Sequence, residues 1–144
     1  MRAKVKYIPC DIYKRGISVF IGTLDQFKAW VNKEYTDKDE QDFVDMVKDL
    51  EEDNIGMASF NYDWKNGQGV VLMSEHPQTP KEVAALAHEM MHATFFIMDF
   101  CRIDYSKETN NEPFTYLHEH LMRNALEDVG YEEVVEEEKS AESQ

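Results

Sequence analysis

The chain has 144 residues and a formal net charge of −14 at pH 7. This length suits a single domain with one core. The acidic balance argues against a nucleic-acid-binding protein, which needs a basic surface, and no apolar run is long enough to span a membrane. The basic N-terminus lacks the apolar run of a signal peptide. The two cysteines, Cys10 and Cys101, have no CxxC spacing, so we expect free thiols in the reducing cytoplasm.

Half of the net charge of the chain lies at the C-terminus. Residues 127–144 contain eight acids and one lysine, a net charge of −7. A run of this kind cannot bury enough apolar surface to fold and is expected to stay solvated. The sequence therefore predicts one domain over residues 1–129 and a disordered acidic tail over residues 130–144. Solubility is the favoured role of this tail, and binding of a partner is the alternative.

The N-terminal part of the chain predicts two strands and a helix. Residues 5–8 precede Pro9 and read as an edge strand. Residues 17–21 are β-branched and almost continuously apolar, which is typical of a buried strand. Thr23, with Gln26 three residues later, is a helix-capping signal. The predicted buried stripe of this helix consists of Leu24, Phe27, Val31 and Tyr35.

A second helix and a hairpin follow. The helix is expected to begin within residues 36–39, to bury Phe43, Val47 and Leu50, and to end at residues 53–56. Residues 58–64 alternate apolar and polar side chains, which predicts a half-buried strand with its aromatic side chains in the core. Asn66 and Gly67 supply the turn, and residues 69–73 form the returning strand.

The next predicted helix has a well-marked start. Thr79 is in position to cap it, Pro80 takes the first helical position, and Glu82 completes a capping box. Apolar residues recur at helical spacing from Val83 onward, so the helix is expected to run to about Met98.

Within this helix lies His88-Glu89-Met90-Met91-His92, which has the form HExxH. Positions i and i+4 share one helix face, so His88 and His92 can hold one metal ion between them. Glu89 is turned by about 100° from His88 and can act as a general base on water. Zn²⁺ suits such ligands, and a catalytic zinc keeps its fourth position open. The alternative is a pair of polar residues on a half-buried helix.

A zinc site of this kind needs a third protein ligand. The metzincin extension HExxHxxGxxH is excluded, because the chain has Phe95 and Met98 where that pattern requires Gly and His. With Asn111-Glu112 and the aromatic run 114–117, the chain resembles the gluzincins. These include thermolysin-like peptidases, ImmA/IrrE-like peptidases and small phage-encoded zincins. The resemblance covers about residues 70–126.

The resemblance implies that a second helix donates Glu112 as the third ligand, in a minimal zincin core. It also implies a zinc metallopeptidase of phage or bacterial origin, acting on a polypeptide substrate in the cytoplasm. Pro113 departs from the family pattern, which more often has a small residue there. Thr109 to Glu112 also reads as a capping box, in which Glu112 would bind no metal. Because Pro113 favours the first helical position, it weakens that alternative.

Three further side chains are candidates on the same helix faces. Tyr116 could donate a hydrogen bond to an oxyanion. Glu119 is the reserve ligand, and Asp99 is a reserve ligand or a hydrogen-bond acceptor for a ligand histidine. Each of these is more often a plain polar residue. His76 could line the cleft, and we expect His118 and His120 to be surface residues.

The predicted fold is α+β, a small and mainly antiparallel sheet with helices on one side and the two metal-bearing helices crossing its face. Under the metallopeptidase hypothesis, Glu89 deprotonates water activated by zinc. The rival hypothesis is a metal-stabilised partner-binding protein without turnover. Its metal would have four protein ligands, with His120 or Cys101 closing the site. A third hypothesis is an ImmA/IrrE-like regulator that cleaves a repressor. The sequence does not predict the oligomeric state.

Overall fold

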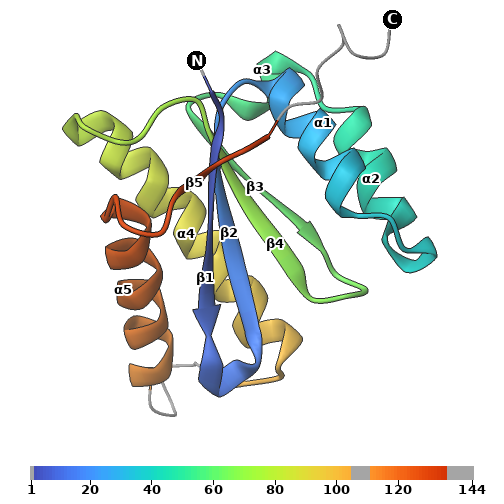
Figure 1. The fold of residues 1–144 in the computed structure, drawn as a ribbon. Coiled ribbons are helices and arrows are strands. Elements are labelled where there is room, and N and C mark those ends of the chain that lie inside the picture. Colours follow the sequence, from blue (N-terminus) through green and yellow to red (C-terminus); the bar gives the residue numbers. More distant parts are fainter. Residues whose placement is uncertain (1, 105–110, 136–144) are drawn as a thin grey trace, which may run out of the picture.

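The computed structural model describes residues 2–104 and 111–135. Its centre is a five-stranded sheet in the order β3-β4-β2-β1-β5 (Figure 1). The strands are β1 (Lys4–Cys10), β2 (Arg15–Ile21), β3 (Ala58–Asp63), β4 (Gln68–Met73) and β5 (Glu132–Glu133). Neighbouring strands are antiparallel except β2 and β4, which are parallel. The sheet is therefore mixed and mostly antiparallel, and the predicted α+β class is confirmed.

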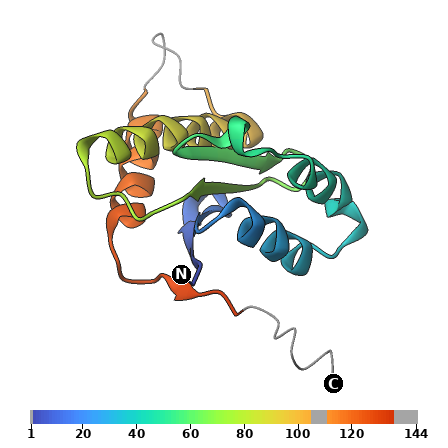
Figure 2. The ribbon, with the colours of Figure 1, turned by 90° about the horizontal axis from the view of Figure 1, so that it is seen from above.

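Helices cover both faces of the sheet (Figure 2). The helices are α1 (Leu24–Glu34), α2 (Gln41–Lys48), α3 (Glu52–Ile55), α4 (Pro80–Phe100) and α5 (Glu112–Leu126). Short 3-10 turns lie at Asp11–Tyr13 and Lys38–Glu40. The prediction of helices on one side only was wrong. Helices lie on both sides because β2 is apolar on both faces. It buries Ile17 and Val19 against α4 and α5, and it buries Phe20 against α1. A strand that is apolar on both faces needs cover on both.

Two predictions near the termini also need correction. β1 is not an edge strand at its start, because Lys4 and Val5 pair with β5 on the side opposite β2. The segment that forms β5 belongs to the predicted tail, and Val134 packs against the core beside α1. The folded part of the chain thus extends past residue 129. Residues 136–144 of the predicted tail lie outside the described residues.

The helix predicted from residue 36 is divided. A 3-10 turn precedes α2, and the short α3 follows as a separate helix. Phe43 and Val47 are buried as predicted, whereas Leu50 is only half-buried. Among the described residues, no helix combines the length and the apolar composition needed to cross a bilayer.

β3 departs from its predicted burial pattern. Tyr62 and Trp64 are 49% and 53% exposed, whereas Asn61 and Asp63 are buried. The buried Asp63 carboxylate accepts hydrogen bonds from the backbone amides of Lys65 and Asn66, so it shapes the turn into β4. Because β3 is the outermost strand of its side of the sheet, the aromatic side chains lie partly in solvent, against Phe96 and Phe100 of α4.

Candidate metal centre

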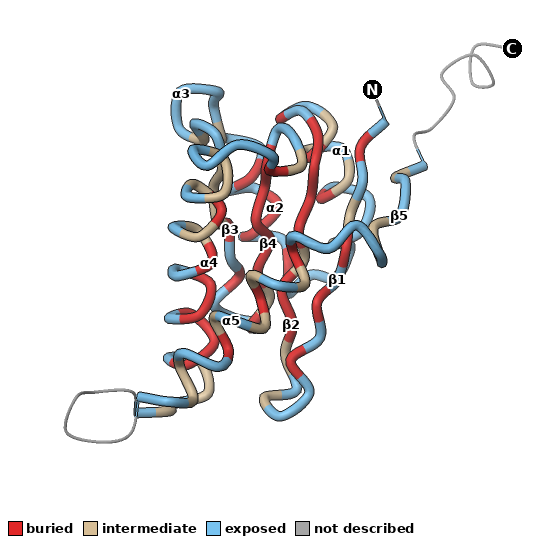
Figure 3. The backbone as a smooth tube through the Cα atoms, turned by 90° about the vertical axis from the view of Figure 1, so that its left-hand side faces the viewer, coloured by how far each residue is buried: buried red, intermediate tan, exposed pale blue. Residues whose placement is uncertain are grey.

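The helix that carries the HExxH stretch is anchored at its start and along one face. The Thr79 hydroxyl accepts a hydrogen bond from the Glu82 amide, and the Glu82 carboxylate accepts one from the Thr79 amide, which confirms the predicted capping box. Leu86, Met90 and Ala93 are buried against the sheet, so the opposite face of α4 points to solvent (Figure 3). Helical periodicity alone places His88 and His92 on this exposed face.

The two histidines lie close enough to share one ion. Their Nε2 atoms are 3.3 Å apart, and their ring centroids are 4.9 Å apart. A tetrahedral zinc with Zn–N bonds of about 2.0–2.1 Å would separate two nitrogen ligands by about 3.3–3.4 Å. The donor pair therefore fits two corners of such a site. The same distance also fits a hydrogen bond between two neutral imidazoles, which needs no metal.

Glu89 lies beside the pair but is directed elsewhere. Its Oε2 accepts a hydrogen bond of 2.9 Å from the backbone N–H of Phe60 in β3. Successive residues of a strand point their main-chain groups to alternate sides. This bond therefore shows that the main-chain groups of Phe60 point to the outer edge of the sheet and not to β4. The main-chain groups of Tyr62, two residues further along β3, point to the same side as those of Phe60. Next to the histidines, the candidate general base thus meets an edge of β3 that pairs with no other strand in the described part of the chain.

Glu112 and Tyr116 lie at a different place. Both line a hollow between the first turns of α5 and the end of β1 with the turn that follows it, where Pro9, Cys10 and Ile12 lie. The exposed Tyr116 phenol donates a hydrogen bond to the Glu112 carboxylate, and this bond and the charge of Glu112 raise the pKa of Tyr116. Glu112 is the first residue of α5, so the predicted second helix is present. Thr109, the other end of the alternative capping box, lies outside the described residues.

The rotation of α5 about its axis explains this placement. Phe114 packs on Phe95 of α4 with ring centroids 4.8 Å apart, and His118 Nε2 lies 3.4 Å from the Ala87 carbonyl oxygen. The α4-facing side of α5 is therefore set by Phe114 and His118. Glu112 comes two residues before Phe114, about 200° around the helix, and so points away from α4.

The described part of the chain assembles no complete metal site. No third His, Cys, Asp or Glu side chain within residues 2–104 and 111–135 joins the two histidines in a group that could hold a metal. Helical rise separates Asp99 from His92 by about 10 Å along α4. Glu119 is exposed on α5, about 100° from His118 and on the solvent side. Glu112, Glu119 and Asp99 as ligands therefore stay predictions.

The remaining histidines and Cys101 have other partners. His120 Nε2 lies 2.8 Å from the Pro9 carbonyl oxygen, and Cys101 Sγ lies 3.9 Å from that of Tyr13. His118 and His120 are half-buried, which corrects their prediction as surface residues. His76 contacts the Leu126 carbonyl oxygen and the Tyr131 ring, so it holds the end of α5 instead of lining a cleft.

The open edge of β3 is the part of the candidate site that sequence analysis missed. The hairpin around Asn66 and Gly67 was predicted, but its outer strand could not be identified, because strand order depends on long-range pairing. The one available signal was the polar Asn61 and Asp63 alternating with the aromatic Phe60 and Tyr62. Comparison of the chain with protein-family models, with curated proteins and with solved structures finds no match.

Proposed function

We propose that this protein is a metal-dependent peptidase of the HExxH type, with zinc as the metal. The observation that carries the proposal is the spacing of the His88 and His92 Nε2 atoms, 3.3 Å, on an exposed helix face. Glu89 lies next to this pair and next to an open strand edge. Metal-assisted hydrolysis of an extended peptide requires a set of metal ligands, a carboxylate that acts as a base, and main-chain groups at a strand edge.

Each of these groups has a role in the proposed reaction. The substrate adds to β3 as a further strand, through the outward main-chain groups of Phe60 and Tyr62. This pairing displaces the Glu89 carboxylate from the Phe60 amide. Glu89 is then free to take a proton from the attacking water and to deliver it to the leaving nitrogen. The metal, when bound, supplies a Lewis acid that polarises the scissile carbonyl and acidifies the water.

The third ligand is the open part of the proposal. Glu112 has the family-like spacing but is about 200° around α5 from Phe114, which packs on α4. Glu119 lies about 100° from His118, which also packs on α4. Glu119 is therefore less far around α5 from the side that packs on α4 than Glu112 is. The Tyr116 phenol donates a hydrogen bond to Glu112, so its proposed role at an oxyanion depends on the position of the Glu112 carboxylate.

The non-catalytic alternative has less support. A metal that ties two helices together needs a closed set of four protein ligands, one more than a catalytic zinc site. The two helices already pack through apolar contacts, which include Phe95 on Phe114 and the buried Leu117 and Leu121. Their association therefore does not depend on a metal.

Substitution of Glu89 tests the proposal. Glu89→Gln keeps the size of the side chain but removes the base, so hydrolysis should fall by about 10²–10⁴-fold. Zinc content, measured by mass spectrometry after loading, should stay the same as in the parent. Cleavage is measured on a mixture of unstructured peptides by mass spectrometry of the products. Glu75→Gln, an exposed acid before α4, is the matched control. Peptide cleavage at the parent rate by the Glu89 variant would overturn the mechanism.

A further inference from the structure

The outer edge of β3 lies beside an aromatic surface. Tyr62 of β3 and Trp64, just after this strand, are 49% and 53% exposed. Both rings pack on the buried Phe96 of α4, at 5.2 Å and 5.6 Å between ring centroids. Phe60 stacks on Tyr62 at 5.6 Å, and Phe100 contacts Trp64 at 5.5 Å. We call these five rings the β3–α4 aromatic cluster. A contiguous and partly exposed apolar surface of this kind is typical of an interaction site.

The cluster extends from the candidate metal centre along the edge of the sheet. Here α4 and β3 run in the same direction, because Glu89 contacts Phe60 and the later Phe100 contacts Trp64. Along β3, Tyr62 lies about 7 Å beyond Phe60. A peptide that pairs with the outer edge of β3 therefore meets Glu89 at one position and the exposed rings two residues away.

Strand pairing determines which side chains of such a peptide reach the cluster. In an antiparallel pair, the commoner arrangement, a residue with outward main-chain groups exchanges two hydrogen bonds with the residue directly opposite, and both side chains lie on one face of the sheet. The main-chain groups of Phe60 and Tyr62 point outward, and their rings lie on the α4 face. The peptide residue opposite Phe60 therefore lies beside Glu89. The peptide residue two positions earlier lies beside Tyr62 and Trp64.

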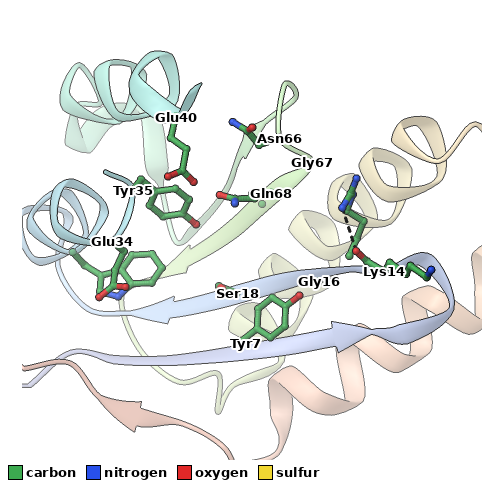
Figure 4. A pocket seen from close by; sticks show the side chains of 13 residues that line it. Tyr7, Lys14, Gly16, Ser18, Glu34, Tyr35, Glu40, Asn66, Gly67 and Gln68 are labelled. Atoms are coloured by element: carbon green, nitrogen blue, oxygen red, sulfur yellow. Dashed lines mark hydrogen bonds between the residues drawn. The ribbon is translucent and has the colours of Figure 1, made fainter. Parts of the chain in front are cut away.

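The other face of β3 is polar. Asn61 and Asp63 point to it and are buried. A hollow of about 380 Å³ lies on that face of the sheet, over β2 and β4 and inward of the β3 edge, and its lining includes Glu34, Glu40 and Gln68 (Figure 4). Because successive side chains of a strand alternate between the two faces, we expect aromatic selectivity only at every second residue of the peptide.

We propose that the substrate is an extended polypeptide segment with an aromatic residue on the N-terminal side of the cleaved bond, two positions before the residue that pairs with Phe60. The inference rests on the proposed peptidase function. The substrate ring packs on Tyr62 and Trp64, which Phe96 and Phe100 hold in place. A charged side chain at this position would lose water and gain no polar partner from the rings.

Cleavage of matched peptides tests the substrate class. The zinc-loaded full chain is given unstructured peptides that differ only in having Phe or Ser at one position, and mass spectrometry identifies the cleaved bond. Phe within three residues on the N-terminal side of that bond should raise kcat/KM by about tenfold or more over Ser. An equal or greater gain from Phe on the C-terminal side would contradict the proposed register.

Two tyrosine variants test whether the cluster causes the preference. Tyr62→Thr removes one ring of the cluster and keeps a residue that favours strands, so the Phe-to-Ser ratio of kcat/KM should fall to about two or less. Tyr7→Thr is the matched control, because it removes a 60% exposed ring from β1, on the face of the sheet with the hollow. This control should leave the ratio unchanged. A parent-like ratio in the Tyr62 variant would overturn the proposal.

Peptide binding without turnover separates this inference from the peptidase function. The chain has two tryptophans, so Trp30→Phe in a Glu89→Gln background leaves Trp64 as the reporter. The Phe peptide should change Trp64 fluorescence saturably, and the Ser peptide should bind at least about tenfold more weakly. Selective binding with no cleavage by the zinc-loaded parent would refute the peptidase function and support recognition of aromatic peptides by the cluster.

Two other results would overturn the inference itself. Cleavage by the parent with no preference for Phe in either assay would support the peptidase function and exclude the aromatic substrate class. A Trp64 signal that changes with protein concentration and not with added peptide would assign the β3 edge to a second copy of the chain.

Discussion

The helices α4 and α5 differ in how they position their candidate metal ligands. α4 starts at a complete capping box and carries two candidate ligands one turn apart. α5 starts at Glu112, after Asn111, whose side chain makes no capping hydrogen bond, and it directs Glu112 to the far side of the helix from α4. A ligand pair within one helix depends only on helical spacing. A third ligand from a second helix depends on how that helix is rotated by its packing, and here Phe114 and His118 decide the rotation.

The largest expected effect is on metal affinity. His88→Ala or His92→Ala should weaken zinc binding by about a hundredfold or more, because each removes a ligand that the helix positions directly. His120→Ala removes an imidazole that contacts Pro9 instead and should change affinity little. Competition with a chromophoric chelator measures all three. Glu112→Gln and Glu119→Gln belong in the same series, since the larger loss identifies the third ligand. Unchanged affinity in both histidine variants would mean that the pair is only a hydrogen bond.

The next largest expected effect is on stability, through the contact of Lys6 in β1 with the end of α5. The buried Lys6 ammonium donates to the Asn124 carbonyl oxygen at the end of α5, and it lies 5.4 Å from the centre of the Tyr131 ring. A cation at a helix C-terminus is stabilising, and hydrogen bonds to charged groups contribute about 1.5–3 kcal/mol. Lys6→Met should therefore lower the free energy of unfolding by about 2 kcal/mol.

Urea denaturation measures this loss, with the exposed Lys4→Met on the same strand as the control. An equal loss in both variants would contradict a specific anchor for α5.

The two helix starts should differ by a smaller amount. Thr79→Ala removes the side-chain cap of α4 and should destabilise the protein by about 1 kcal/mol. Asn111→Ala should cost clearly less, because the Asn111 side chain makes no such bond. Thermal unfolding of both variants checks the difference. An equal loss in the two would show that α5 also has a cap in solution.

The cap of α4 also predicts a pH dependence. Hydrogen bonds from the backbone amides of Thr79 and Gln78 lower the pKa of Glu82. A carboxyl whose pKa is lower in the folded state contributes stability above its unfolded pKa, about 4.3. That contribution is lost as the pH falls through the lower folded value. Glu82→Gln should remove this part of the acid sensitivity, seen as a flatter dependence of stability on pH.

The smallest expected effect is on the pKa of Tyr116, which depends on the position of the Glu112 carboxylate. Because Glu112 raises the pKa of Tyr116, Glu112→Gln should lower that pKa toward the ordinary tyrosine value. Glu119, which is a weaker cause of the same shift, should matter less when changed to Gln. Ultraviolet titration of tyrosinate, with Tyr116→Phe to assign the signal, measures both. A Tyr116 pKa that is unmoved by loss of Glu112 would place that carboxylate elsewhere.

Sequence patterns predicted much of the fold where the cause is local. The capping boxes at Thr23 and Thr79 are confirmed. The positions of β3 and β4 in the hairpin were also predicted. The errors concern position in the sheet: β1 has a second neighbour, helices lie on both faces, and the Tyr62 and Trp64 side chains are exposed. Each of these depends on pairing between distant segments, which local patterns do not contain.

What the sequence determined by itself is the geometry within one helix. The i, i+4 spacing of His88 and His92 and the capping at Thr79 place two imidazoles on one face wherever that helix packs. Tertiary structure alone decided that the edge of β3 meets Glu89 and that α5 turns Glu112 away from α4. The physical reason is the distance along the chain over which each interaction acts. Helical spacing is set by neighbouring residues. Helix rotation and strand order result from the burial of apolar side chains that are far apart in the chain.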